Sequence, residues 1–136
     1  MTQAASIDYR FWCEEKLRNA DTDQQGHVNN ALMATLLEAA RIELLAAPEI
    51  DDIRAATQIV VVKQLIVFKQ ELFFPGTARI GTHCSRVGRT SLDFAQTVQA
   101  ANGEVATGEA TCVLLDRATR KPTPVPERLR TYLIGT

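Results

Sequence analysis

The stretch from Thr57 to Phe68 constrains the fold more than any other part of the sequence. It is rich in Val and Ile, which favour strands, and its apolar side chains fall on both faces of an extended chain. One face carries Val60, Val62, Ile66 and Phe68, and the other carries Ile59, Val61, Leu65 and Val67. A strand that is apolar on both faces belongs at the centre of a sheet or at an interface.

Four other segments also have strand patterns. Residues 9–18 alternate in a way typical of a half-buried strand. Later in the chain, Phe74-Pro75-Gly76 and Gly88-Arg89 are turn signals, and Asn102-Gly103 favours a type I′ hairpin. The strands predicted between and after these turns are residues 78–87, 91–101 and 104–116. They form a meander of three strands linked by hairpins.

One long amphipathic helix is predicted from Ala31 to the proline at position 48, about four turns. Asn29 or Asn30 is its expected N-cap. The apolar stripe consists of Leu32, Met33, Leu36, Leu37, Ala40 and Leu44, and the opposite side carries Ala34, Glu38, Arg41 and Leu45. After three prolines, at positions 122, 124 and 126, residues 127–133 predict a short terminal helix.

This order of elements predicts an α+β domain spanning residues 1–136, with an antiparallel sheet of about five strands and one long helix. A single helix covers one face of such a sheet, whereas the strand from Thr57 to Phe68 is apolar on both. A second copy of the chain would cover the remainder, so we expect a two-fold dimer.

Composition excludes several classes of function. The 15 basic and 16 acidic side chains give a net charge of −1, so no global field draws the chain to nucleic acid or to an anionic membrane. Cys13, Cys84 and Cys112 are too dispersed for a disulfide framework or a zinc site, and we interpret them as buried thiols in a reducing cytosol. Without a targeting signal or a spanning segment in the sequence, we expect a cytoplasmic protein.

Polar residues that could carry chemistry cluster just before the predicted long helix. Asp21, Asp23, His27, Asn29 and Asn30 fall within ten residues. The N–H groups at a helix start attract negative charge, so a thioester carbonyl held there would have its developing oxyanion stabilised. A nearby carboxylate could then activate water or attack the carbonyl directly.

The segment Asp21-Thr22-Asp23-Gln24-Gln25-Gly26-His27-Val28-Asn29-Asn30, followed by Glu38-Ala39-Ala40-Arg41, resembles the 4-hydroxybenzoyl-CoA thioesterase-like family of hot-dog acyl-CoA thioesterases. Weaker similarity continues through Phe74-Pro75-Gly76 and Gly88-Arg89-Thr90-Ser91-Leu92 to the prolines near the end. The resemblance implies a sheet wrapped around a central helix, a homodimer or homotetramer, and a site at the subunit interface. It also implies hydrolysis of acyl-CoA or acyl-carrier-protein thioesters without a metal or redox cofactor, coenzyme A being part of the substrate.

By the same resemblance, Asp23 is the catalytic carboxylate, and His27 with Asn29 and Asn30 shapes the carbonyl pocket. Plant acyl-carrier-protein thioesterases are also similar here, but they carry Asn where this chain has Gln25. A second hot-dog type uses a glutamate on the helix, which makes Glu38 a reserve carboxylate.

Each candidate residue also has a structural interpretation. Asp21 and Asp23 could simply accept hydrogen bonds from N–H groups of the loop. His27 could bond backbone carbonyls, and Glu38 could form a surface ion pair with Arg41. His83, in mid-strand, is expected to be structural.

The turn of Gly88, Arg89, Thr90 and Ser91 could bind a phosphate or be a simple hairpin. The basic cluster Arg117, Arg120 and Lys121 could meet the CoA nucleotide or be solvated. The function favoured overall is thioester hydrolysis. A non-catalytic acyl-thioester sensor is the alternative, and an enoyl-thioester hydratase ranks third.

Overall fold

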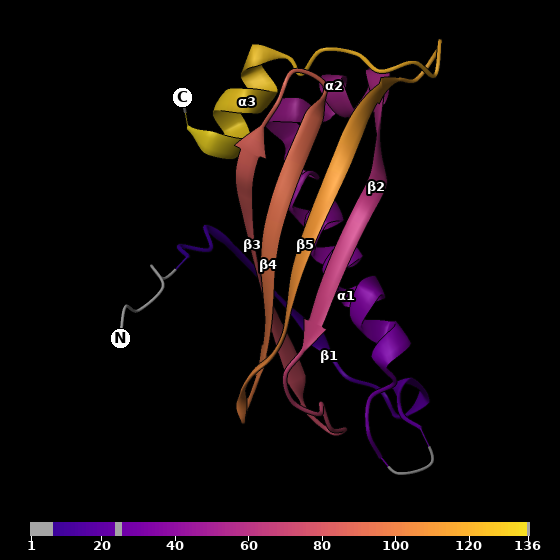
Figure 1. Ribbon diagram of the computed structural model, residues 1–136, viewed down its shortest axis with the longest axis vertical. Coiled ribbons are helices and arrows are strands. Elements are labelled where there is room, and N and C mark those ends of the chain that lie inside the picture. The colour runs from indigo at the N-terminus through magenta and orange to yellow at the C-terminus, as the bar shows by residue number, and fades with distance from the viewer. Residues whose placement is uncertain (1–6, 24–25, 136) are drawn as a thin grey trace.

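The computed structural model describes residues 7–23 and 26–135. Its centre is one five-stranded antiparallel sheet with the strand order β1-β3-β4-β5-β2 (Figure 1). The strands are β1 (Phe11–Lys16), β2 (Thr57–Phe68), β3 (Thr77–Val87), β4 (Ser91–Ala100) and β5 (Gly103–Asp116). The predicted strands are confirmed, with β2 matching at both ends and β3, β4 and β5 forming the expected meander.

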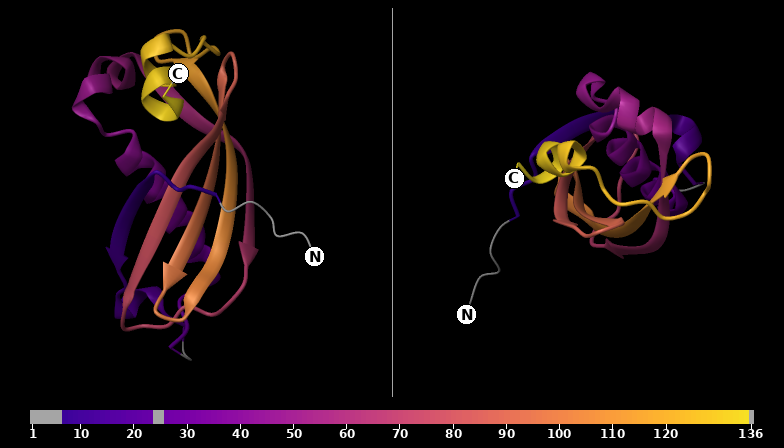
Figure 2. Two further views of the ribbon diagram at one scale, coloured as in Figure 1. Left: turned by 90° about the vertical axis from the view of Figure 1, so that its left-hand side faces the viewer. Right: turned by 90° about the horizontal axis from the view of Figure 1, so that it is seen from above.

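The long helix α1 (Asn30–Leu44) lies against one face of the sheet, which curls around it (Figure 2). Its start is fixed as predicted, because the Asn29 Oδ1 accepts a hydrogen bond of 2.9 Å from the N–H of Ala31. The residues that α1 buries are Met33, Leu36, Leu37, Ala40 and Arg41. The α+β arrangement of a sheet wrapped around one long helix is therefore the observed one.

Short helices close the two ends of the sheet. A 3₁₀ turn, η1 (Asn19–Asp21), lies in the loop before α1, whereas η2 (Pro48–Ile50), α2 (Asp51–Ala56) and α3 (Glu127–Ile134) gather at the other end (Figure 1). The terminal helix was predicted. The pair η2 and α2 was not, because its few apolar residues, among them the buried Ile50 and Ile53, are too few to show a helical period.

The strand β2 is an edge strand, so the expectation of a central strand is wrong for a single subunit. It pairs only with β5 in the described sheet, through a register that shifts between Val61 and Lys63. Its apolar side chains remain exposed, with Val62 at 59% and Leu65 at 52%. The second interpretation from the sequence, that this strand lies at an interface, stays a prediction.

The β4–β5 turn differs from the predicted type I′ turn. A type I′ turn needs a positive φ at both central residues. Among the described non-glycine residues, positive φ is found at Arg120, and in this turn it falls on Gly103, at 103°. The left-handed backbone is therefore confined to the second of the two expected positions, Gly103, which is the first residue of β5.

α1 packs closely on the sheet at Gly108 in β5. A Cβ placed on Gly108 would lie 2.7 Å from the Leu37 Cδ1, which is shorter than any ordinary carbon–carbon contact. Gly108 and Leu37 are both buried. The missing side chain lets the helix lie directly on the strand.

We therefore expect Gly108→Val to destabilise the fold by about 1–3 kcal/mol, because overpacking must displace Leu37 and the helix with it. Urea unfolding followed by circular dichroism measures the change. The matched control is Thr107→Val, on the opposite face of the same strand, which should stay within about 0.5 kcal/mol of the wild type. Equal losses in the two variants would show that Gly108 does not set the helix position.

No helix among the described residues is both long and apolar enough to cross a membrane.

Candidate active site

A tight turn holds Asp23 just ahead of α1. The Asp23 N–H donates to the His27 carbonyl at 2.8 Å, and the His27 N–H donates to the Asp23 Oδ1 at 3.1 Å. An antiparallel bridge between Thr22 and Val28 closes the same turn. Residues 24 and 25, including the Gln25 that distinguishes this chain from the plant enzymes, lie outside the described residues. The exposed Asp23 carboxylate is thus fixed on the approach to the helix start.

Asp21 stabilises this loop through hydrogen bonds to Arg18. Its Oδ2 accepts from the Arg18 N–H and its Oδ1 from the Arg18 Nη2, both at 2.9 Å. These bonds to Arg18 hold the pKa of the Asp21 carboxyl below its usual value. The Asp21 carbonyl in turn accepts from the Asn29 N–H at 2.9 Å, next to the helix cap. This is the structural role that was considered for Asp21.

His27 is oriented by the segment that follows β2. Its Nδ1 lies 3.1 Å from the Glu71 Oε1, and its ring packs edge-on against Phe73 with 5.0 Å between the ring centroids. A bridge pairs the backbones of His27 and Phe73, and the next residue, Val28, donates its N–H to the Leu72 carbonyl at 2.6 Å. The ring of His27 therefore meets a carboxylate and an aromatic face, not the backbone carbonyls considered from the sequence.

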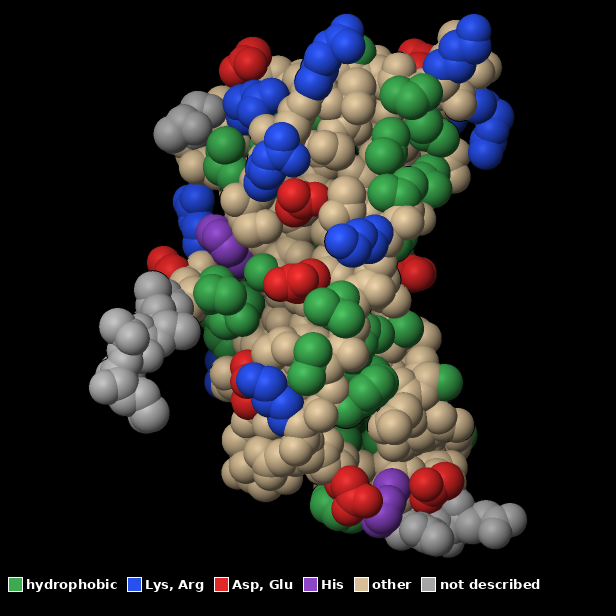
Figure 3. Space-filling view, in the orientation of Figure 1, with side chains coloured by type: hydrophobic (Ala, Val, Ile, Leu, Met, Phe, Trp, Pro, Cys, Tyr) green, Lys and Arg blue, Asp and Glu red, His purple; other side chains and the backbone are tan. Residues whose placement is uncertain are grey.

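Glu71 and Phe73 are site residues that sequence reasoning missed. Both belong to the connection between β2 and β3, more than 40 positions after His27, and no local pattern links them to the loop. Asn29 and Asn30 are both exposed at the helix start, where Asn29 is the cap and Asn30 is the first helical residue. Figure 3 shows acidic side chains on either side of a histidine at this end of the molecule.

The turn of Gly88, Arg89, Thr90 and Ser91 lies at the opposite end of the sheet, beside α3 (Figure 1). The Gly88 N–H donates to the Ser91 carbonyl at 2.8 Å, and the Arg89 carbonyl accepts from the Val125 N–H at 2.8 Å. The hairpin interpretation is confirmed, and the Arg89 side chain is exposed. One subunit does not bring this turn together with Asp23.

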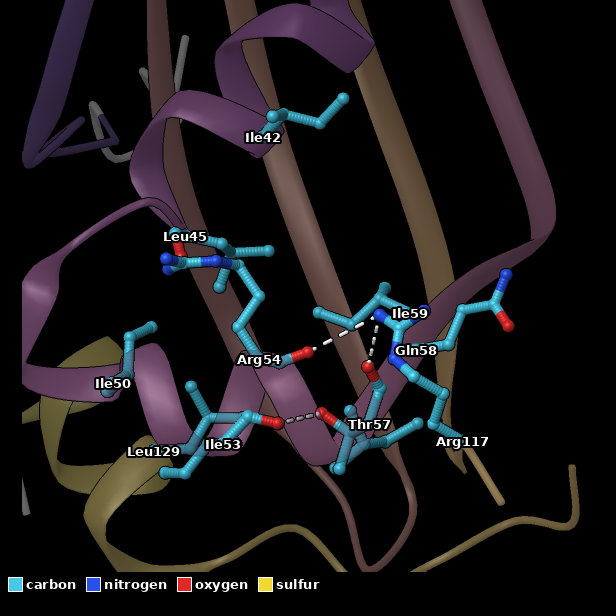
Figure 4. A pocket seen from close by; sticks show the side chains of 11 residues that line it. Ile42, Leu45, Ile50, Ile53, Arg54, Thr57, Gln58, Ile59, Arg117 and Leu129 are labelled. Atoms are coloured by element: carbon cyan, nitrogen blue, oxygen red, sulfur yellow. Dashed lines mark hydrogen bonds between the residues drawn. The ribbon is translucent and has the colours of Figure 1, made fainter. Parts of the chain in front are cut away.

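Two members of the basic cluster are anchored near the start of β2, also at this far end. Arg117 donates through its Nη2 to the carbonyls of Arg54 and Thr57, at 3.3 and 2.9 Å (Figure 4). Arg120 donates to the Gln58 Oε1 at 3.4 Å. The cluster therefore lies on the edge of the sheet that β2 forms.

Glu38 and Arg41 do not form the expected surface ion pair. Arg41 is buried, with 5% of its surface exposed, and its Nη1 donates to the Gln96 Oε1 at 2.9 Å. Glu38 is exposed and lies with Arg41 along a cavity of about 400 Å³ between α1 and β2. At 1.5 Å per residue, Glu38 is about 12 Å along the helix from Asn30, so it is remote from the Asp23 turn.

The three cysteines are buried free thiols, as interpreted from the sequence. Burial raises the pKa of the Cys13 thiol to about 12 and that of the Cys84 thiol to about 11, and it raises the pKa of Cys112 as well. At neutral pH these groups are protonated, and a protonated thiol is a poor nucleophile. His83, expected to be structural, lies in mid-strand on β3, away from the Asp23 turn.

Comparison with known proteins settles the family. The model of the Thioesterase-like superfamily matches residues 17–133. The chain belongs to that superfamily. The predicted family and activity class, a thioester hydrolase with the hot-dog fold, are thereby confirmed. No curated protein matches the chain.

Several solved structures resemble the chain over most of its length. A thioesterase from Thermus thermophilus, solved with coenzyme A and Zn, is 27% identical and covers 91% of this chain and 92% of its own, with a TM-score of 0.79. The PA5185 protein of Pseudomonas aeruginosa is 24% identical and covers 93% of this chain and 91% of its own, with a TM-score of 0.84. A 1,4-dihydroxy-2-naphthoyl-CoA thioesterase from Synechocystis is 16% identical over 90% and 94%, with a TM-score of 0.76. The last two show the shared fold.

Proposed function

We propose that this thioesterase-like protein hydrolyses acyl-CoA or acyl-carrier-protein thioesters at the start of α1, with Asp23 as general base or nucleophile. The observation that carries the proposal is the Asp23 turn, which fixes an exposed carboxylate immediately before a helix N-terminus. The partial positive charge of that terminus favours the oxyanion that forms when the thioester carbonyl is attacked.

Two routes use the same geometry. As a general base, Asp23 takes a proton from a water molecule while the water oxygen attacks the carbonyl carbon. The tetrahedral intermediate then expels the thiolate, which takes up the proton. As a nucleophile, the Asp23 carboxylate attacks the carbonyl carbon and expels the thiolate, which leaves a mixed anhydride. Water then hydrolyses this anhydride to the free acid and restores Asp23. His27, held by Glu71 and Phe73, is the second group that we assign to catalysis, and Asn29 and Asn30 bound the carbonyl pocket.

A homodimer formed through β2 would complete this site. Two copies that pair their β2 edges in antiparallel fashion are inverted end to end, so the far end of one lies beside the helix start of the other. The partner would then supply the turn of Gly88, Arg89, Thr90 and Ser91, or the basic cluster, to the phosphates of coenzyme A. The exposed apolar side chains of β2 and the position of Arg117 at the β2 edge support this arrangement.

Light scattering should therefore give a mass of at least twice the 15.0 kDa of one chain, as a dimer or a tetramer. Val62→Asp places a charge on the exposed edge of β2 and should produce monomers, since a buried unpaired charge opposes association. The monomers should lose thioesterase activity while keeping the wild-type circular dichroism spectrum. An active wild-type monomer would contradict both the interface and the shared site.

Asp23→Asn should fold, assemble and bind acyl-CoA nearly as the wild type does, while kcat falls by at least about 10²-fold. Asparagine still accepts a hydrogen bond from the His27 N–H, but it is neutral and cannot serve as base or nucleophile. The free thiol released from a panel of short, long and aromatic acyl-CoAs measures hydrolysis.

Asp21→Asn is the matched control in the same loop, and its kcat should stay close to that of the wild type. If Asp23→Asn retains most of the activity, the carboxylate lies elsewhere and Glu38→Gln is the next variant. Tight binding without hydrolysis in the wild type would instead indicate a non-catalytic acyl-thioester sensor.

Arg89→Ala should raise KM for acyl-CoA more than it lowers kcat. A contact with a phosphate far from the carbonyl stabilises ground state and transition state about equally. The effect should shrink with a pantetheine thioester, which lacks the nucleotide. Equal losses on both substrates would show that Arg89 only supports its turn.

A further inference from the structure

One face of α1 runs from the helix start to a cavity that begins at Glu38. Ala31, Ala34, Glu38, Ile42 and Leu45 recur at intervals of three and four residues, so they share one side of the helix. The first two are small, whereas the last three line the cavity between α1 and β2. An acyl chain whose carbonyl sits at the helix start can lie along this face and end in the cavity.

The cavity is mostly apolar. Its walls include Ile59, Val60 and Val61 from β2, together with Phe94 and Cys112 from the inner face of the sheet. It adjoins a second cavity of about 260 Å³, and the two share Ile42, Leu45, Gln58 and Ile59 (Figure 4). Such a lining suits an alkyl chain, and it offers little to stabilise a charged group.

Arg41 is the one basic residue in this lining, whose other polar members are Glu38 and Gln58. It is 5% exposed, its Nη1 bonds the neutral amide of Gln96, and among the described residues no carboxylate lies within ion-pair distance of its guanidinium. The Gln96 amide is itself committed, because its Nε2 donates to the Leu37 carbonyl and the Thr82 Oγ1. Burial lowers the pKa of the Arg41 guanidinium, the sign that its charge has lost water without an equal replacement.

The other arginines along these cavities direct their guanidinium groups to carbonyls or to a carboxylate of the protein. Arg54 donates to the Leu45 carbonyl at 2.8 Å and pairs with Asp51, and Arg117 donates to two carbonyls (Figure 4). Glu38 attracts Arg41 from a distance, but it is exposed at the water side of the groove, where solvent screens its charge. The guanidinium of Arg41 is therefore the strongest hydrogen-bond donor that the cavity offers a ligand.

We propose that Arg41 binds the terminal carboxylate of a dicarboxylic acyl group, which makes ω-carboxyacyl thioesters the preferred substrates. This inference rests on the proposed function for the position of the thioester carbonyl. A planar guanidinium matches a carboxylate with two parallel hydrogen bonds, a geometry that a methyl end cannot use. Arg41 follows Asn30 by 11 residues, or about 16 Å along the axis, and side chains lean toward the helix start, so the acyl chain must span somewhat less.

The test is a matched pair of non-hydrolysable CoA ketone analogues, equal in chain length, that end in a carboxylate or in a methyl group. Isothermal titration calorimetry on the wild type should give at least about tenfold tighter binding for the carboxylate probe, because its carboxylate forms charge-assisted hydrogen bonds with the guanidinium. The preference should be absent for the shortest chains, which do not reach Arg41. Equal affinities at every length would overturn the proposal and assign Arg41 to contacts within the protein.

Arg41→Met should abolish the preference while changing the affinity for the methyl-ended probe by no more than about threefold. Arg86→Met, which removes an exposed guanidinium outside the groove, is the control and should keep the preference. If Arg41→Met does not fold, the wild-type comparison and the Arg41→Lys variant show whether Arg41 binds the carboxylate. Lysine keeps the charge but loses the planar fork, so the preference should fall without vanishing, and an undiminished preference would contradict the bidentate contact.

The analogues bind without being cleaved, so this experiment is separate from the hydrolysis screen. A carboxylate preference in a protein that cleaves no thioester would contradict the proposed function and keep the Arg41 site. Hydrolysis of methyl-ended substrates without a carboxylate preference would support the proposed function and contradict the Arg41 site.

Discussion

The close packing of α1 on the sheet, which includes the contact between Leu37 and Gly108 of β5, helps to hold the functional loop in position. A helix that rests directly on a strand has little freedom to slide, and the Gln96 side chain adds a hydrogen bond of 2.9 Å to the Leu37 carbonyl. Since α1 is rigid over its 15 residues, fixing it at Leu37 also fixes its first turn. The Asp23 turn, the Asn29 cap and the His27 ring are thereby held in a constant relation to the sheet.

Much of the fold could be predicted because its determinants are local. The alternation of β2, the turn residues around β3, β4 and β5, and the stripe on α1 each depend on neighbours a few positions away. The environment of Arg41 could not be predicted in this way. Its partner Gln96 is 55 positions distant, and helical spacing alone placed Arg41 on the side opposite the apolar stripe. Periodicity assigns a face, but it does not show where a neighbouring element covers that face.

Part of the candidate site could likewise be predicted from neighbouring residues, and part could not. Asp23, His27 and the cap at Asn29 fall within one loop, so their proximity could be expected from the sequence. The pairing of His27 with Glu71 and Phe73 needs the β2–β3 connection to fold back onto that loop, which only the tertiary structure reveals. The Arg89 turn is a candidate because its guanidinium, hydroxyl and N–H groups suit a phosphate, whereas topology puts it at the other end of the same chain.

The two edges of the sheet differ in a way that governs how copies can join. β1, at one edge, has 6 residues, whereas β2, at the other, has 12 and presents exposed valines and leucine. A long exposed edge offers more unpaired N–H and C=O groups than a short one, so copies that pair edge to edge would pair through β2 in preference to β1. Once two β2 strands face each other, both remaining margins are short β1 strands. A dimer paired in this way would leave its long β2 edges covered, and it would not extend into an open-ended fibre.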